Sequence, residues 1–323
     1  MRPMRRTLCT LLTATALLAA AACGGGSGSP SGSSAGGVRT IKVGAIAIAD
    51  TAPVHLAVSK GIFKKHGLNA KITAVQGGAA GISGVMGGQF DFAFANTTSI
   101  LTAAARNLPI KVVSNGNSST GVPGKDFSAV VVRKDSPVKS AKDLEGKTIA
   151  VNQLKNIGDT TIRAAVRKAG GDPSKPKFVE MPFPDMPAAL AKGRVDAVWI
   201  VEPFLTQVTG SGGRAVVWNF AEAAPDLTVA MYFTSSKLAQ QDPDLVKRFT
   251  AAINEAFAYA TAHPDAARKE LLTYTQIPAA TVGKITLSKW PIAINRASVE
   301  TIADDALKDG VLSKKPDLDA LLP

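Results

Sequence analysis

The chain has 323 residues and a formal net charge of +12, with 46% hydrophobic and 6% aromatic side chains. Its basic residues are scattered and form no run interleaved with aromatic residues, so a nucleic-acid-binding protein is not indicated. Cys9 and Cys23 are the two cysteines, too few for a disulfide framework. The aliphatic-rich, aromatic-poor composition is typical of an α/β protein.

A secretory leader is predicted at residues 1–22. Three arginines form a basic head, and an apolar run from 8 to 22 follows, which is too short for a membrane-spanning helix. The motif AAAC at 20–23 resembles a bacterial lipobox, with alanine where leucine is usual, so Cys23 is the predicted lipidation site. A plain signal peptide cleaved after the alanines is the alternative. Residues 23–39, rich in Gly and Ser, predict a flexible tether.

Short apolar segments alternate with amphipathic segments along the rest of the chain, which predicts strands alternating with helices. The predicted strands are 40–47, 69–75, 90–95, 110–114, 127–133, 148–152, 177–181, 195–200, 214–218 and 228–235. The predicted helices are 53–66, 78–88, 98–107, 159–169, 186–192, 203–209 and 243–262. We expect an α/β protein with two lobes, each a mainly parallel sheet flanked by helices. Lobe I is predicted to comprise 40–120 and 228–323, and lobe II 121–227.

Four sequence blocks carry a resemblance to a known family. They are PVHLAVSKGIFKKHGL at 53–68, MGGQFDFA at 86–93, DLEGK at 143–147, and GRVDA followed by EPF within 193–204. With these blocks in this order, the chain resembles the solute-binding proteins of nitrate, taurine and alkanesulfonate ABC importers, including those for thiamine-pyrimidine precursors. The resemblance implies the two-lobed type II periplasmic-binding-protein fold.

The resemblance also implies a function and a set of partners. The protein would be the extracytoplasmic component of an ABC importer, a monomer anchored to the cell membrane by its lipid. It would capture a small polar solute of the sulfonate, taurine, nitrate or thiamine-precursor class between its lobes and deliver it to the permease and its ATPase. No cofactor, no nucleic acid and no catalytic role are predicted.

Two other functions stay open. The same fold houses thiamine-pyrimidine synthases, but such an enzyme would need a cytosolic location and a cysteine-rich motif, and this sequence has only the two cysteines named above. A ligand-sensing lipoprotein without a permease is the third interpretation.

Polar residues follow several of the predicted strands and precede helices, where family ligands usually bind between the lobes and helix N-termini supply donors. The predicted ligand-binding residues are Asp50, Thr51, His55, Gly77, Asn96, Thr97, Thr98, Asn152, Asn156, Gly158, Asp159, Thr160 and Glu202. The three histidines share no metal-ligand spacing, so no metal site is predicted.

Three of the predicted acids have an equally simple structural interpretation. Asp50, or its neighbour Thr51, would serve as an N-cap, and Glu202 suits a helix start with or without a ligand. Asp159 either caps its helix or faces the cleft. In the cleft its charge would disfavour a simple sulfonate and favour a cationic or amine-bearing solute, or a neutral heterocycle with N–H donors.

Overall fold

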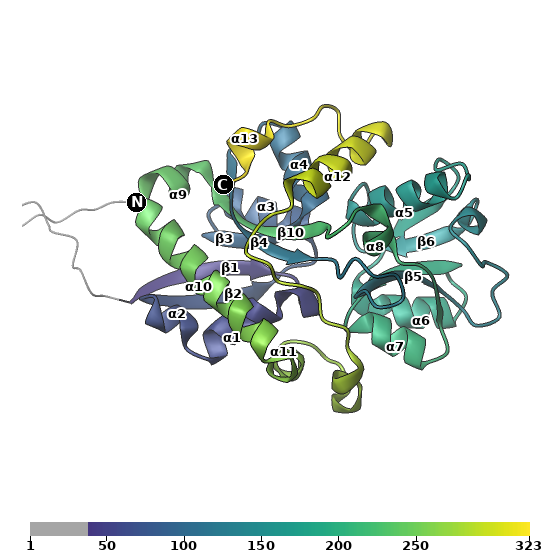
Figure 1. The fold of residues 1–323 in the computed structure, drawn as a ribbon, viewed down its shortest axis with the longest axis horizontal. Coiled ribbons are helices and arrows are strands. Elements are labelled where there is room, and N and C mark those ends of the chain that lie inside the picture. Colours follow the sequence, from purple (N-terminus) through teal and green to yellow (C-terminus); the bar gives the residue numbers. More distant parts are fainter. Residues whose placement is uncertain (1–37) are drawn as a thin grey trace, which may run out of the picture. The chain divides into compact units, whose positions relative to one another are not determined.

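The computed structural model describes residues 38–323, whose fold is built on two five-stranded sheets (Figure 1). The predicted leader, the lipidation site at Cys23 and most of the tether lie outside the described residues. Among the helices of residues 38–323, none has the length and apolar character that a membrane crossing requires.

The first sheet has the strand order β2-β1-β3-β10-β4. Strands β1, β2 and β3 pair in parallel, and β10 pairs antiparallel with both β3 and β4. The bounds are β1 (Arg39–Ala45), β2 (Leu68–Ala74), β3 (Phe92–Asn96), β4 (Ile110–Ser118) and β10 (Thr228–Ser235).

The second sheet repeats this plan with the order β7-β6-β8-β5-β9. Strands β6, β7 and β8 pair in parallel, and β5 pairs antiparallel with β8 and β9. The bounds are β5 (Ser128–Val132), β6 (Thr148–Val151), β7 (Lys177–Glu180), β8 (Ala197–Val201) and β9 (Arg214–Val217). The two-lobed α/β fold is confirmed. Each sheet is mixed, because one strand, β10 or β5, runs against the other four.

Every predicted strand is present, because each is a short run of apolar residues that a sheet covered on both faces can bury. All five residues of β5 and of β8 are buried, as the continuous runs SAVVV and AVWIV require. The edge strand β2 instead begins with alternating buried and exposed residues. Strand β4 extends four residues beyond its predicted end, through Asn115, Gly116 and Asn117.

Helices cover the sheets, and one predicted helix is divided in two. The segment 53–66 forms α1 and α2, because Gly61 adopts a left-handed conformation with φ 71° between them. The helix bounds are α1 (Ala52–Ser59), α2 (Ile62–Lys65), α3 (Gly78–Met86), α4 (Thr97–Ala105), α5 (Ile157–Lys168), α6 (Met186–Ala191), α7 (Phe204–Gly210), α8 (Asn219–Ala223), α9 (Ser236–Gln241), α10 (Pro243–Ala262), α11 (Pro264–Glu270), α12 (Arg296–Lys308) and α13 (Leu318–Leu321).

The long helix α10 lies across one face of the first sheet (Figure 1). Its Phe249 ring stacks on Phe92 of β3, with 3.9 Å between the ring centroids, and also packs against Tyr232 of β10. These rings are fully buried, so α10 is held to the sheet by aromatic burial.

The chain passes from the first sheet to the second between β4 and β5, and it returns between α8 and β10. We call each sheet with its helices a lobe. The lobe limits predicted above, 40–120 with 228–323 and 121–227, are kept as a proposal.

The two lobes contact each other directly. Arg167 of α5, in the second lobe, forms ion pairs with Asp305 and Asp309 at the end of α12 in the first. The backbone N–H of Ala49 donates to the carbonyl of Glu202 across the same junction, at 3.0 Å. The lobes therefore touch at α5 with α12 and at the backbone of Ala49 with that of Glu202.

Candidate functional site

The first group of site residues lies in the turn after β1. Asp50 is 3% exposed, and its Oδ2 accepts a hydrogen bond from Asn117 Nδ2 of β4 at 2.8 Å. Its Oδ1 has no hydrogen-bond partner within residues 38–323, and neither has Asn117 Oδ1. The backbone carbonyl of Asp50 accepts from Trp290 Nε1 at 3.0 Å, which holds the turn in place.

Burial has the largest effect on the pKa of Asp50. Removal of the carboxyl from water raises its pKa from 3.8 to about 7, against the opposing effect of its hydrogen bonds with its own backbone and Asn117. The nearby negative charges of Asp126 and Glu202 raise it further. Asp50 is thus a carboxyl that titrates near neutral pH, with one free acceptor oxygen.

Thr51 occupies the predicted N-cap position of α1, whereas Asp50 is not an N-cap. Thr51 precedes α1, but its side chain makes no capping hydrogen bond. Its hydroxyl instead lies 2.8 Å from the carbonyl of Ile46 and 3.0 Å from that of Ile48, to which it donates. Thr51 therefore stabilises the turn that carries Asp50.

A second group joins the two lobes through side-chain amides. Asn96 at the end of β3 donates to Asn156 Oδ1 at 2.6 Å, while its own Oδ1 accepts from the backbone of Ser99 and caps α4. Asn156 in turn donates to Ser99 Oγ at 2.8 Å. All three residues are buried, so this bridge is shielded from water.

The hydroxyls beside this bridge differ in their bonding. Thr97 donates to the carbonyl of Thr228 at 2.6 Å, within the first lobe. Thr98 is completely buried, and its Oγ1 has no partner in the described part of the chain. Thr97 is thereby occupied, while Thr98 offers a free hydroxyl.

A third contact between the lobes lies at Gly77, which precedes α3. A Cβ atom there would lie 2.9 Å from Oε1 of the flexible Gln153 side chain, so the loop after β6 comes close to this glycine. Asn152 of the same loop is 4% exposed and donates to the carbonyl of Gln76 at 3.5 Å. Asn152 Oδ1 has no partner among residues 38–323.

Helix α5 begins differently from the prediction. Its N-cap is Asn156, and Asp159 lies within the first turn, so the N-cap interpretation of Asp159 is wrong. Asp159 Oδ2 accepts from the backbone N–H of Lys155 at 2.8 Å, and Oδ1 is unpartnered within the described residues. Burial raises the pKa of Asp159 from 3.8 to about 6.

The neighbours of Asp159 have roles within their own lobe. A Cβ atom on Gly158 would lie 2.5 Å from the ring of Trp199 in β8, so the close approach at this glycine is to an aromatic ring. Thr160 is completely buried and donates to the carbonyl of Asn156 at 3.0 Å.

Glu202 is buried at the junction, and both of its carboxylate oxygens are occupied. Oε2 accepts from the backbone N–H of Thr206, and Oε1 accepts from the Thr206 hydroxyl at 2.7 Å and the backbone N–H of Thr286 at 3.2 Å. Burial raises its pKa. Glu202 therefore supports the start of α7. It also links the second lobe to the segment that contains Thr286.

His55 stacks face to face on Tyr274, with 3.6 Å between the ring centroids. Its burial lowers its pKa from 6.5 to about 4, so the imidazole is neutral at neutral pH. The hydroxyl of Tyr274 donates to the carbonyl of Ile48, beside the turn that carries Asp50.

Two residues of this region were not among the predicted ligands. Asn117 lies beyond residue 114, where the predicted strand ends, among the buried amides that β4 carries to Ser118. Tyr232 lies in β10, inside a run of buried residues. It is completely buried with an unpartnered hydroxyl in the described chain, and the charge of Asp50 adds to the burial that raises its pKa. A polar group inside an apolar run is the signal at Tyr232, and the polar run SNGNS at the end of β4 is the signal at Asn117.

The buried charges of the described chain all have one sign. Among residues 38–323, the charged side chains that are buried are Asp50, Asp126, Asp159 and Glu202, and no Lys, Arg or His is buried. In the same residues no group of three His, Cys, Asp or Glu side chains is placed to hold a metal ion. The chain is basic as a whole, but its interior is acidic.

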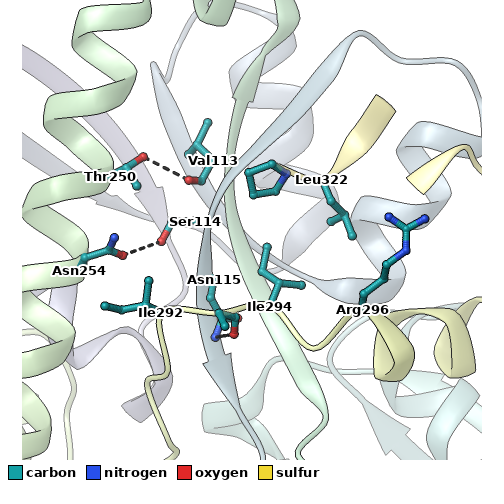
Figure 2. Close-up of a pocket in the computed structure, with 11 residues that line it drawn as sticks. Val113, Ser114, Asn115, Thr250, Asn254, Ile292, Ile294, Arg296 and Leu322 are labelled. Atoms are coloured by element: carbon teal, nitrogen blue, oxygen red, sulfur yellow. Dashed lines mark hydrogen bonds between the residues drawn. The ribbon is translucent and has the colours of Figure 1, made fainter. Parts of the chain in front are cut away.

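Two cavities help to place the site. One of about 310 Å³ lies between α3, α4 and the loop 153–156, and it includes Ser99 and Asn156 of the amide bridge. Another, of about 390 Å³, is lined by β4, α10 and residues 292–296 and 322–323 (Figure 2). None of the predicted ligand residues lines this second cavity, where Thr250 bonds to Val113 and Asn254 to Ser114 (Figure 2). The first cavity therefore adjoins the amide bridge between the lobes, while Asp50, Asn117, Asn152 and Asp159 line neither cavity.

The fold and the buried polar junction define a two-lobed protein of the periplasmic-binding-protein class, and comparison with known proteins agrees. An alkanesulfonate-binding protein of Xanthomonas axonopodis pv. citri, solved with bound MOPS, superposes with a TM-score of 0.76. It is 17% identical, and the match covers 90% of this chain and 99% of that one. This likeness shows the fold.

Residues 48–267 match the NMT1/THI5-like family, and the chain belongs to that family. A Brucella abortus protein named as a binding protein is 26% identical over 236 residues, 68% of this chain and 70% of the relative. A riboflavin-binding protein of Chloroflexus aurantiacus is 25% identical over 245 residues, 74% of this chain and 66% of the relative. The predicted family resemblance is confirmed, and the relatives are binding proteins.

Proposed function

We propose that this protein is the extracytoplasmic substrate-binding component of an ABC importer. In this function it captures one small polar solute between its lobes and delivers it to a membrane permease. The family membership and the fold support this role, because relatives by sequence and neighbours by structure are both named as binding proteins.

One observation supports the proposed location of the solute. Within residues 38–323, both lobes contain buried oxygens without a hydrogen-bond partner: Asp50 Oδ1 and Asn117 Oδ1 in the first lobe, and Asn152 Oδ1 and Asp159 Oδ1 in the second. Buried polar atoms without partners destabilise a fold, and native proteins contain few of them. We infer that a solute bound between the lobes bonds to these atoms.

The proposal includes a membrane anchor and excludes catalysis. Export by the leader, lipidation of Cys23 and a flexible tether would hold a monomer at the outer face of the cell membrane, beside the permease and its ATPase. The predicted site residues supply hydrogen bonds and charge, and we assign no reacting group among them.

Thermal unfolding of the purified protein tests the binding role. A solute that binds only the folded protein stabilises it by about 2.7 kcal/mol at 100 times its dissociation constant, which raises the melting temperature by several degrees. The panel comprises sulfonates, taurine, nitrate, thiamine precursors, riboflavin, amino acids and polyamines. One class is expected to raise the melting temperature, and a flat response to the whole panel would contradict the proposal.

The anchor requires a separate test. Metabolic labelling with a radioactive fatty acid is expected to label the wild-type chain and not the Cys23→Ser variant. Labelling of both, or of neither, would contradict lipidation at Cys23.

A further inference from the structure

Two buried acceptor oxygens of the first lobe lack a donor among the described residues. Asp50 and Asn117 are at most 3% exposed, and Asn117 Nδ2 donates to Asp50 Oδ2 at 2.8 Å. When Asp50 is ionised its carboxylate only accepts hydrogen bonds, so the Asn117 amide that donates Nδ2 to it leaves its own oxygen free. Asp50 Oδ1 and Asn117 Oδ1 consequently have no donor within residues 38–323.

The second-lobe surface has the same acceptor character. Asn152 Oδ1 and Asp159 Oδ1 are buried as well, and neither has a partner within residues 38–323. A sulfonate or nitrate presents only acceptor oxygens, so it would leave all four atoms unsatisfied. A solute with N–H donors would satisfy them.

The charges at this place oppose an anion independently of the hydrogen-bond pattern. Asp126 and Glu202 lie close enough to Asp50 for their charges to affect it, and both are fully provided with donors. Lys and Arg residues are absent from the buried side chains of the described chain. A buried negative charge without a cationic partner is costly, and a cation bound beside it removes that cost.

The N-terminus of α5 does not make the site favourable for an anion. The N-terminus of a helix is commonly an anion site because its amides are free. Here Asp159 lies in the first turn of α5 and already accepts from the backbone of Lys155, so a carboxylate is present where an anion would bind.

We propose that the solute of this protein carries a cationic nitrogen with N–H donors, which binds against Asp50 and Asn117. An ammonium, an amidinium or guanidinium group, or a protonated ring nitrogen fits this description. The inference rests on the proposed function and narrows its solute from small polar compounds in general to nitrogenous cations.

Calorimetric titration of the full-length protein tests the proposal with two sets of probes. Putrescine, agmatine, arginine and thiamine form the cationic set, and butanesulfonate, nitrate and sulfate form the anionic set. At least one cationic probe is expected to bind, and Asp50→Asn is expected to weaken that binding about 100-fold, as loss of one charge of a buried pair does. The matched control is Asp135→Asn, which removes the same charge from a side chain 84% exposed and should leave the affinity unchanged.

The outcomes separate the inference from the function on which it rests. Binding of anionic probes alone would leave a solute-binding protein and overturn the cationic solute. Cation binding of equal strength in the wild type and in Asp50→Asn would also overturn it, because Asp50 would then not contact the solute. If neither these probes nor any compound of the wider panel binds, both proposals fail.

Discussion

Replacement of Asp50 by asparagine should stabilise the ligand-free protein, and the gain should grow with pH. The pKa of Asp50 is about 7 in the folded protein against an ordinary value of 3.8. Between these values the folded protein binds a proton that the unfolded chain releases, so stability falls as pH rises from about 4 to about 7. The asparagine of the variant would be neutral throughout and would still accept from Asn117.

The size of the effect follows from the two pKa values. At about 1.4 kcal/mol per pH unit, their separation amounts to about 4 kcal/mol above pH 7. At pH 4 the carboxyl of folded Asp50 is protonated and resembles the amide, so the two proteins should be about equally stable. At pH 8 the variant should be more stable by about 4 kcal/mol, or about 8 °C in melting temperature.

Urea unfolding of both proteins at pH 4, 5, 6, 7 and 8, without ligand, measures this difference. Asp159 and Glu202 also have raised pKa values, so the wild-type stability alone would fall for several reasons. The difference between the wild type and Asp50→Asn isolates Asp50. The exposed Asp135→Asn variant controls for net charge and should follow the wild type at every pH.

Two results would refute the reasoning. Parallel curves for the wild type and Asp50→Asn from pH 4 to pH 8 would show that Asp50 has an ordinary pKa. A variant that is less stable at pH 8 would show that the charged carboxylate is a structural group of the fold. Either result would contradict the interpretation that the Asp50 carboxylate is buried in order to bind a ligand.

Three other variants test the packing and the junction. Gly158→Ala should destabilise the protein by about 1–3 kcal/mol in urea unfolding, because its Cβ would meet the Trp199 ring at 2.5 Å; a neutral effect would show that the ring moves. Arg167→Met removes the ion pairs of α5 with α12 and should destabilise by about 1–2 kcal/mol, less in high salt; an effect insensitive to salt would point to lost packing instead. Asn156→Ala removes the amide bridge between the lobes and should destabilise by about 2 kcal/mol, with an increase in the radius of gyration measured by X-ray scattering; an unchanged radius would show that the other contacts hold the lobes together.

Much of the fold was predictable because its elements are encoded locally. Each strand is a short apolar run, and the all-buried runs in β5 and β8 leave little choice but a covered sheet. The division of the helix at 53–66 was not predicted. It depends on Gly61 adopting a left-handed conformation, which an apolar pattern does not reveal.

The site was predictable only as a set of loops. The polar residues after β3 and before α5 stand out in the sequence, since they follow apolar runs. Which of them are occupied depends on distant atoms: Thr160 bonds within its own turn, but Thr97 bonds to the carbonyl of Thr228, 131 residues away. The capping interpretations of Asp50 and Asp159 failed for the same reason, because the backbone of each turn decides which amide is within reach.

The sequence by itself determined the alternation of strands and helices, the family, and the polar loops that follow the strands, because these depend on residues close together in the chain. Only the tertiary structure decided which oxygens remain free. Asp50 meets Asn117 from 67 residues away, and Asn96 meets Asn156 from 60 residues away. Whether a buried polar atom has a hydrogen-bond partner depends on all of its neighbours in space. These neighbours decide that the buried polar groups described above are acidic and rich in free acceptors.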